Sequence, residues 1–408
     1  MTDRAPIALG LFLMGHGHNV GSWRSSPTPA QDLLTLDHYR RIAVDAERGR
    51  MDMIFFAEIL YSYELAGRHE GALAFPTLDP FVLIPALSAV TQSIGFVGTY
   101  STSYTDPVGT ARKLATIDRL NGGRTGWNIV TTGADQSAAN FSPRQHPGKA
   151  ERYALAYDYV ASVRHQWQAM PPLPQGEPVR VQAGMSADGK GFAATVAEVM
   201  FTIARAKDDA VAFRTSMREA LTATGRDPAD LRIMPGIAPI LGGTVAEARQ
   251  AEERYLELLH PRIQLAMLGD QFGMDFSGYA LDAPLPMDDI RQAPKVLSGA
   301  RDPDRLINAD GGVPTLGDYL RSQARVRAHH SFVGTPEQLA DQLDEWTAAG
   351  ACDGFNLMFP VQAEGVSAVV DHVSPLLQRR GLLRTDYRGS TLRHHLGLNE
   401  PTRETMKV

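Results

Sequence analysis

The sequence predicts an α/β protein of the TIM (β/α)8 barrel class. Short apolar runs alternate with longer helical patterns along the chain, which is the rhythm of successive strand–helix units. Eight of these runs are each followed by a helix, and eight parallel units close naturally into a barrel rather than an open sheet. The chain of 408 residues exceeds the roughly 250 of a basic barrel, so insertions must carry the surplus.

The predicted strands are the apolar runs between turn signals. In chain order they are IALGLFLM, MDMIFFAE, IGFVGTYS, RTGWNIVTT, PVRVQAG, VMFTIAR, LRIMPGIAPI and GFNLMF. The first run ends at Gly15 and His16 after about eight residues, which is too short for a membrane span and fits a buried strand. We therefore expect neither a signal peptide nor a membrane anchor.

Helical periodicity follows the predicted strands. Helices are expected over about 36–48, 78–92, 107–120, 151–168, from 190, 209–222, 245–259, 335–349 and 367–379. Two segments exceed ordinary loops: 131–150 after the fourth strand, and 261–330, which is polar, rich in Pro, Gly and Asp, and weakly periodic. Because no linker, repeat or low-complexity tract interrupts the chain, we expect one domain over 1–408 with these two insertions.

Composition excludes several classes of function. With 43% hydrophobic and 21% charged residues, the chain can form a large core. Its net charge of −6 provides no sustained basic face, so nucleic acid is not an expected partner. The single cysteine, Cys352, can form no internal disulfide, which suits a reducing compartment. We expect a cytoplasmic protein that binds a small molecule.

Polar side chains gather where the predicted strands end. In a TIM barrel the carboxyl ends of the strands form the active face. Asn128, Thr131 and Thr132 end the fourth strand, and Ser101 and Thr102 end the third. An amide and several hydroxyls at this rim can bind the polar edge of a planar ligand. The alternative is that residues such as Ser101 only cap the helices that follow.

The turn QAGMSADGKG, residues 182–191, joins the fifth strand to a helix. Gly184 and Ser186 let the backbone approach a phosphate closely, and the next helix offers unpaired N–H groups and its positive dipole end. An ordinary turn with glycines explains the same residues equally well. The residues alone leave both interpretations open.

Histidine and cysteine side chains are candidate catalytic groups. His16 and His18 lie in a glycine-rich loop after the first strand, so they face the barrel mouth and can act as acid or base near neutral pH. The other histidines, including His329 and His330, lack metal-ligand spacing, so no metal site is expected. Cys352 precedes the last strand, at the face that serves stability, and no G-x-S-x-G elbow or P-loop occurs.

Several longer blocks resemble one group of flavin enzymes. The blocks are ARKLATIDRLNGGRTGWNIVTT, AANFS, ERYALAYDYV, PQGEPVRVQAGMSADGKGFAATVAEVMFT, FVGTPEQLADQLDEWTAAGACDGFNLMFP and LLQRRGLLRTDYRGSTLRHHLGL. They are similar to the nitrilotriacetate monooxygenase component A group of the bacterial-luciferase-like superfamily, whose relatives include dibenzothiophene-sulfone and long-chain alkane monooxygenases. The similarity extends from about residue 6 to the carboxyl end, and the GWNIVTT and QAG-S blocks together are specific.

The resemblance implies a bacterial-luciferase-like TIM barrel that uses reduced FMN and O2. In such enzymes a separate NAD(P)H-dependent flavin reductase delivers FMNH2. Oxygen adds at carbon 4a of the flavin, and the peroxide oxygenates a small organic substrate. Relatives commonly form homodimers or homotetramers.

The resemblance also implies roles for individual residues. The amide and hydroxyl of the WNIVT block line the flavin, the QAG-S turn holds the phosphate, and the tyrosine of RY approaches it. His18 is the residue expected nearest the reacting oxygen. Together with Ser101 from the rim, the expected cofactor-binding residues are Glu58, Ser101, Asn128, Thr132, Tyr153, Gly184, Met185 and Ser186.

The chain departs from these relatives in two places. Glu58 stands where relatives usually carry Asp, which shifts a flavin contact by one methylene. Relatives also have roughly two dozen more residues before PQG, at Pro174, so the substrate pocket is expected to differ. The insertion 261–330 is the expected lid. Two alternative functions remain: deazaflavin-dependent hydride transfer in the same superfamily, and flavin binding without catalysis.

Overall fold

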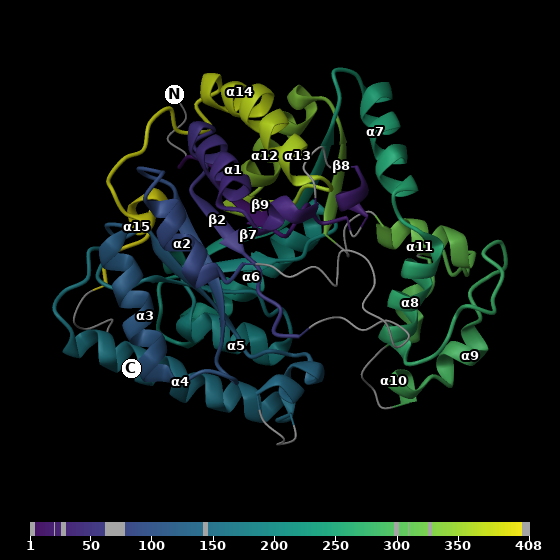
Figure 1. Cartoon of the computed structure of the whole chain (residues 1–408), viewed down its shortest axis with the longest axis horizontal. Coiled ribbons are helices and arrows are strands. Elements are labelled where there is room, and N and C mark those ends of the chain that lie inside the picture. Colours follow the sequence, from purple (N-terminus) through teal and green to yellow (C-terminus); the bar gives the residue numbers. More distant parts are fainter. Residues whose placement is uncertain are drawn as a thin grey trace.

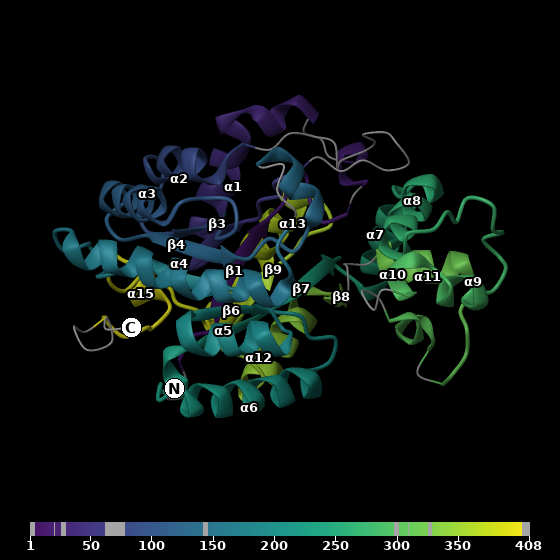
Figure 2. The same cartoon turned by 90° about the horizontal axis from the view of Figure 1, so that it is seen from below.

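A closed barrel of parallel strands forms the centre of the protein. The computed structural model describes residues 5–19, 21–25, 30–61, 78–141, 146–297, 302–308, 310–324 and 329–401. In these ranges the barrel strands are β1 (Ala8–Leu13), β2 (Met53–Phe56), β3 (Gly95–Ser101), β4 (Thr125–Val130), β5 (Val179–Gln182), β6 (Val199–Thr202), β7 (Arg232–Leu241) and β9 (Gly354–Leu357). Each pairs in parallel with the next, and β9 closes the ring between β7 and β1. Helices surround the strands in Figure 1, and Figure 2 labels β1, β9 and β7 next to one another. The predicted TIM barrel and its eight strands are confirmed.

Helices pack around the outside of the barrel. They are α1 (Leu36–Arg48), α2 (Pro80–Ser88), α3 (Pro107–Leu120), α4 (Lys149–Ala169), α5 (Ala187–Val196), α6 (Lys207–Ala223), α7 (Val245–Glu257), α12 (Pro336–Ala348), α13 (Gln362–Ala368) and α14 (Ser374–Arg379). The predicted bounds of α1 and α3 are confirmed at both ends. At α3, the Asp106 side chain caps the helix and Pro107 occupies its first turn, so the sequence defines the start.

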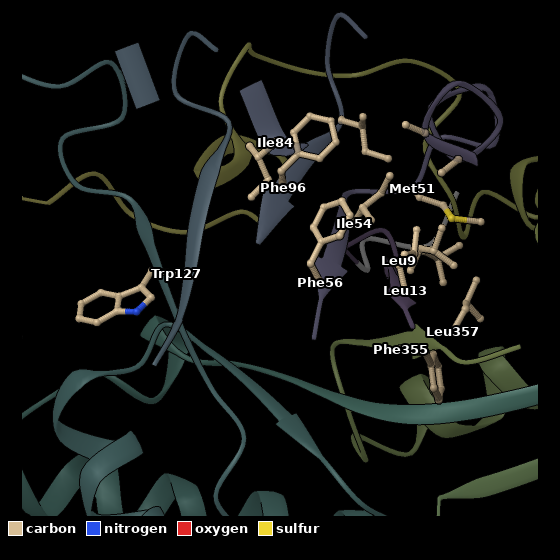
Figure 3. Close-up of a cluster of buried hydrophobic side chains, with 14 of the residues drawn as sticks. Leu9, Leu13, Met51, Ile54, Phe56, Ile84, Phe96, Trp127, Phe355 and Leu357 are labelled. Carbon is tan, nitrogen blue, oxygen red and sulfur yellow. The ribbon is translucent and has the colours of Figure 1, made fainter. Parts of the chain in front are cut away.

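Strand alternation divides the apolar side chains into two layers. Met53, Val97 and Val181 belong to the cluster that fills the barrel. Outward-facing side chains pack under the helices, and Figure 3 shows Ile84 of α2 beside Phe96 of β3. Full burial of a side chain of this size stabilises the fold by about 1.5–3 kcal/mol. The barrel is therefore a filled core, and its rim is left to bind ligands.

The C-terminal segment closes the bottom of the barrel. Leu392 in α15 (Leu392–His395), with Leu396 and Leu398, joins the cluster inside the barrel. Between these leucines the guanidinium of Arg393, on a side chain 1% exposed, donates to the Glu198 carboxylate at 2.6 and 3.3 Å. This segment is therefore held by apolar burial and by a buried ion pair.

Two regions differ from the sequence-based expectation. Strand β8 (His330–Gly334) was not predicted. It pairs with the second half of β7 and is only half-buried. A half-buried strand does not need the long apolar run by which the other strands were recognised. The segment expected to be weakly periodic contains α8 (Pro261–Phe272), α9 (Met287–Arg291), α10 (Pro294–Leu297) and α11 (Leu316–Ala324), which share a core of their own. Figures 1 and 2 place these helices together at one side of the molecule, beyond α7.

No helix among the described residues combines the length and the apolar character that a membrane span requires.

Replacing Arg393 with methionine is expected to lower the free energy of unfolding by about 3–5 kcal/mol, because Glu198 loses a buried partner. Burial opposes ionisation of Glu198, but the charges of Arg180 and Arg393 outweigh it and lower its pKa to about 2. The stabilisation that the ionised Glu198 carboxylate gives to the folded state is present above about pH 4.5 and is lost as the pH falls towards 2. Urea unfolding at several pH values measures it.

The matched control is Arg388→Met, since Arg388 is exposed. A loss in Arg393→Met no larger than in this control would show that the ion pair does not hold the C-terminal segment.

Candidate active site

A cavity of about 740 Å³ opens at the carboxyl ends of β2, β3, β4 and β5. This volume is typical of sites for cofactors and other small ligands. Five of the predicted cofactor residues line it: Glu58, Ser101, Thr132, Tyr153 and Gly184. The barrel brings them together because parallel strands present their carboxyl ends at the same rim.

Residues of β4 support one wall of this cavity. Asn128 is buried, does not line the cavity, and donates from Nδ2 to Oγ1 of Thr99 at 2.8 Å. Thr99 lines the cavity and donates in turn to the Phe56 carbonyl at 2.8 Å. The Oδ1 atom of Asn128 is buried and has no hydrogen-bond partner among the described residues. Asn128 therefore lies one layer below the cavity, and its Oδ1 atom is an unused hydrogen-bond acceptor among the described residues.

Two hydroxyl groups meet at the rim. Ser101 Oγ lies 2.6 Å from Thr132 Oγ1, and the N–H of Ser103 donates to Ser101 Oγ at 3.1 Å. Thr132 has a φ of +46°, a left-handed conformation that is rare for a β-branched residue and costs roughly 1–3 kcal/mol. The chain thus holds the Thr132 hydroxyl against Ser101 at a local energetic cost. The alternative that Ser101 caps the next helix is wrong, because Asp106 caps α3.

The first turn of α4 brings positive charge to the β5 side of the cavity. Lys149 and Arg152 line it, one helical turn apart. Arg152 donates from Nη1 to the Pro147 carbonyl at 2.6 Å, while its buried Nε has no partner among the described residues. Lys149 forms an ion pair of 2.9 Å with Asp188 in the first turn of α5. The cations of the first turn of α4 and the start of α5 beside Gly184 make this the more positive side of the cavity.

The turn after β5 is shaped for close approach. A Cβ atom at Gly184 would lie 2.5 Å from Gln182 Nε2 and 2.8 Å from the Tyr153 hydroxyl, so a larger residue would displace these side chains. Ser186 caps α5 by accepting from the N–H of Gly189 at 3.3 Å, and its O–H remains able to donate. Met185 turns away, since its sulfur accepts from the Ile203 N–H at 3.0 Å. Neither Ser186 nor the Met185 side chain lines the cavity.

Lys149 and Arg152 were not predicted from the sequence to line the site. A signal was available, because cations in the first turn of a helix oppose the positive end of its dipole. Such a placement is unfavourable unless an anion is bound nearby. Two donors that line the cavity fit a phosphate, the buried Nε of Arg152 and the hydroxyl of Tyr153. The first turn of α5 packs against Gly184 directly behind them.

The β2 side of the cavity is aromatic and acidic. Tyr100 and Phe81 meet edge-on with ring centroids 4.9 Å apart, and both line the cavity with Glu58 and Asp79. Burial, together with the charge of Asp79, raises the pKa of the Glu58 carboxyl to about 7. Neighbouring strands lie about 4.8 Å apart, so the ends of β2 and β5 are on the order of 14 Å apart. A phosphorylated chain bearing a tricyclic ring can bridge such a span.

The predicted catalytic residue His18 does not line this cavity. It is buried at the mouth of the barrel, where Nε2 lies 2.9 Å from the Phe12 carbonyl and the two rings are 4.8 Å apart. Phe12 in turn meets Phe55 and Phe201 edge-on. His18 therefore borders an aromatic floor inside the rim.

His16 and Cys352 lie apart from the cavity lining. His16 is buried, and its burial lowers the pKa of its ring. Cys352 is buried just before β9, and burial raises the pKa of its thiol to about 12, which disfavours the thiolate. Within the described ranges, no group of three or more His, Cys, Asp or Glu side chains could hold a metal ion.

Comparison with known proteins places this site in a family. The sequence profile of the luciferase-like monooxygenases matches residues 12–353. The chain is 38% identical to N-acetyl-S-(2-succino)cysteine monooxygenase of Bacillus subtilis, with 100% of both chains covered. It is 33% identical to nitrilotriacetate monooxygenase component A of Aminobacter aminovorans, with 98% of each covered.

Solved structures agree with this assignment. The structure of DmoA from Hyphomicrobium sulfonivorans is similar with a TM-score of 0.83 and 26% identity, over 98% of this chain and 93% of that one. A riboflavin lyase crystallised with modified FMN and riboflavin is similar with a TM-score of 0.82 and 27% identity, over 98% of both chains. The chain therefore belongs to the luciferase-like monooxygenase family, and it is an oxidoreductase of the flavin-dependent monooxygenase class.

Proposed function

We propose that this protein is the oxygenase component of a two-component system. It takes reduced FMN from a separate NAD(P)H-dependent flavin reductase and uses O2 to oxygenate a small organic substrate. The observation that carries the proposal is the cavity between β2 and β5, which has an anion-binding end and an aromatic, hydroxyl-lined end on the same rim. These two ends suit the two halves of FMN.

The residues present fit FMN as follows. Arg152, Tyr153 and the first turn of α5 would hold the phosphate, because each offers a donor in the same corner. Ser101 and Thr132 would bind polar atoms of the ring. When bound, reduced FMN supplies the two electrons with which one oxygen atom of O2 enters the substrate and the other leaves as water.

The remaining residues of the mouth shape the reaction space. Asn128 lies behind this wall and fixes the Thr99 hydroxyl, which lines the cavity beside the proposed ring position. Aromatic side chains such as Phe12 and Phe81 would exclude water, which limits wasteful loss of the activated oxygen. We assign His18 to a proton-holding role at the substrate side, since it borders this floor.

The substrate is proposed only by class. The named substrates of the two relatives described above are both small molecules with several carboxylates. Thioethers and amines of that kind are therefore the first compounds to test.

We also propose that the protein resides in the cytoplasm with the reductase and forms a homodimer or homotetramer. The single buried cysteine suits a reducing compartment. We further propose that 131–150 and 261–330 are insertions into one domain, with the second closing over the mouth as a lid.

An oxygenated product is expected to form only when the protein, O2, FMN, NADH, a flavin reductase and an oxidisable thioether or amine are all present. Oxygen uptake with product analysis by mass spectrometry measures this coupling. Binding of deazaflavin without binding of FMN would assign the chain to hydride transfer instead. Tight binding of reduced FMN with no turnover of any compound would make it a non-catalytic homologue.

Arg152→Ala is expected to weaken binding of reduced FMN by roughly 1.5–3 kcal/mol, about 10- to 100-fold in Kd, because a charged donor to the phosphate is lost. Anaerobic fluorescence titration measures the affinity. Arg112→Ala, an exposed arginine on α3, is the control. Equal affinities in the two variants would place the phosphate elsewhere.

His18→Ala is expected to lower kcat by about 10²-fold or more while the affinity for reduced FMN stays within about twofold, as for loss of an acid or base. Stopped-flow turnover and flavin titration on one preparation separate the two quantities. An unchanged kcat removes His18 from the reaction.

A further inference from the structure

Two carboxyl groups face the cavity on its β2 side. Glu58 follows β2 and its Oε1 accepts from the N–H of Ile59 at 3.0 Å. Asp79 caps α2, where its Oδ1 accepts from the N–H groups of Phe81 and Val82 at 2.7 and 3.3 Å. Asp79 therefore caps the helix, whereas Glu58 accepts one hydrogen bond, at Oε1, within the part of the chain that the structure describes.

Among the described residues, no cation acts on the Glu58 carboxyl group. The cations that line the cavity in the described residues, Lys149 and Arg152, come from α4 on the β5 side. Lys113 of α3 lies behind the wall, with Nζ 2.8 Å from the Tyr100 hydroxyl. Asp79 is the charged neighbour that acts on Glu58, and it acts by repulsion.

This arrangement favours a neutral carboxyl group. Burial disfavours the charged form of Glu58, and the nearby charge of Asp79 adds to the effect, so the pKa is raised to about 7 while the Ile59 N–H opposes the rise. Near neutral pH, Glu58 is therefore divided between a form that can donate a hydrogen bond and a form that carries a negative charge.

We propose that Glu58 is a positioning residue that gates the flavin cavity by its protonation. Its neutral carboxyl group donates a hydrogen bond to the bound reduced FMN, and its carboxylate repels this anionic nucleotide. The inference rests on the proposed function, because it requires reduced FMN in this cavity.

A simple consequence follows for affinity. If only the neutral form binds well, the apparent Kd rises in proportion to the loss of that form. With a pKa of about 7, the Kd of the wild type is about tenfold higher at pH 8 than at pH 6. Binding above neutral pH takes up one proton, by linkage.

The test is an anaerobic titration of reduced FMN between pH 6 and 8 on the full chain and on Glu58→Gln. The glutamine is neutral at every pH, so its Kd changes only through ionisation of the flavin itself. The ratio of the wild-type Kd to that of Glu58→Gln therefore isolates Glu58, and it is expected to rise about tenfold over this range. Glu219→Gln, on the exposed face of α6, is the matched control and should follow the wild type.

A second variant, Asp79→Asn, changes the pH at which the affinity for reduced FMN falls. Asp79→Asn keeps a good helix cap but removes the repelling charge, so the pH at which affinity declines should shift downwards. A residue that only supports the fold would not produce such a shift.

The titration of Glu58 can also be followed without any flavin. Infrared difference spectra of the apoprotein should show a protonated carboxyl group near pH 6 that disappears above pH 8 and is missing in Glu58→Gln. Thermal unfolding at several pH values tests the raised pKa independently. Because the folded pKa is raised, the wild type loses stability relative to Glu58→Gln as the pH rises from 4.5 to about 7.

These measurements distinguish a failure of the Glu58 gate from a failure of flavin binding itself. Parallel pH profiles for the wild type and Glu58→Gln overturn the gate but leave flavin binding intact. A Glu58 that is already ionised at pH 6 in the apoprotein overturns the gate as well. Failure of all variants to bind reduced FMN, with the infrared titration as expected, overturns the proposed function and with it the gate.

Discussion

The closure of the parallel sheet is the constraint on which the rest of the structure depends. β9 pairs with β1 on one side and with the middle of β7 on the other, and this fixes the ring. Once the ring is closed, all strand carboxyl ends meet at one rim. The interior below is filled by apolar side chains and by the leucines of the C-terminal segment. Rigid support from below leaves the rim free for polar groups that would be costly in a core.

The cavity follows from this geometry. Strands β2 to β5 are neighbours in the ring, so loops that are far apart in sequence line one cleft. Its two sides differ in chemistry because different helices reach them. The first turn of α4 brings cations to one side, whereas the cap of α2 and the end of β2 bring carboxyl groups to the other. This polarity orients a ligand that has an anionic end and a ring.

Much of this arrangement could be predicted from the sequence, and for physical reasons. Apolar runs with helical segments between them gave the barrel, and the rule about strand ends led to Ser101, Thr132 and Gly184, which line the cavity. β8 was not predicted because it pairs with β7 outside the closed ring and is only half-buried. The helices α8 to α11 were not predicted because α9 and α10 have only five and four residues and the group packs around a small core of its own.

Side-chain direction was the hardest feature to predict. Asn128 was expected at the rim but lies one layer below it, and Met185 turns towards the end of β6. Both outcomes depend on rotamers and neighbours that no local pattern encodes. Arg152 was missed for the related reason that a cation near a helix start resembles a solvated charge until its buried nitrogen is seen.

The central claim is that this cavity binds FMN in one direction, with the phosphate at α4 and α5 and the ring towards β2. A crystal structure of the complex with FMN tests it most directly. The account predicts phosphate oxygens within hydrogen-bond distance of Arg152 and a ring edge within reach of Glu58 and Ser101. FMN bound outside this cavity, or with its phosphate beside Glu58, would contradict it.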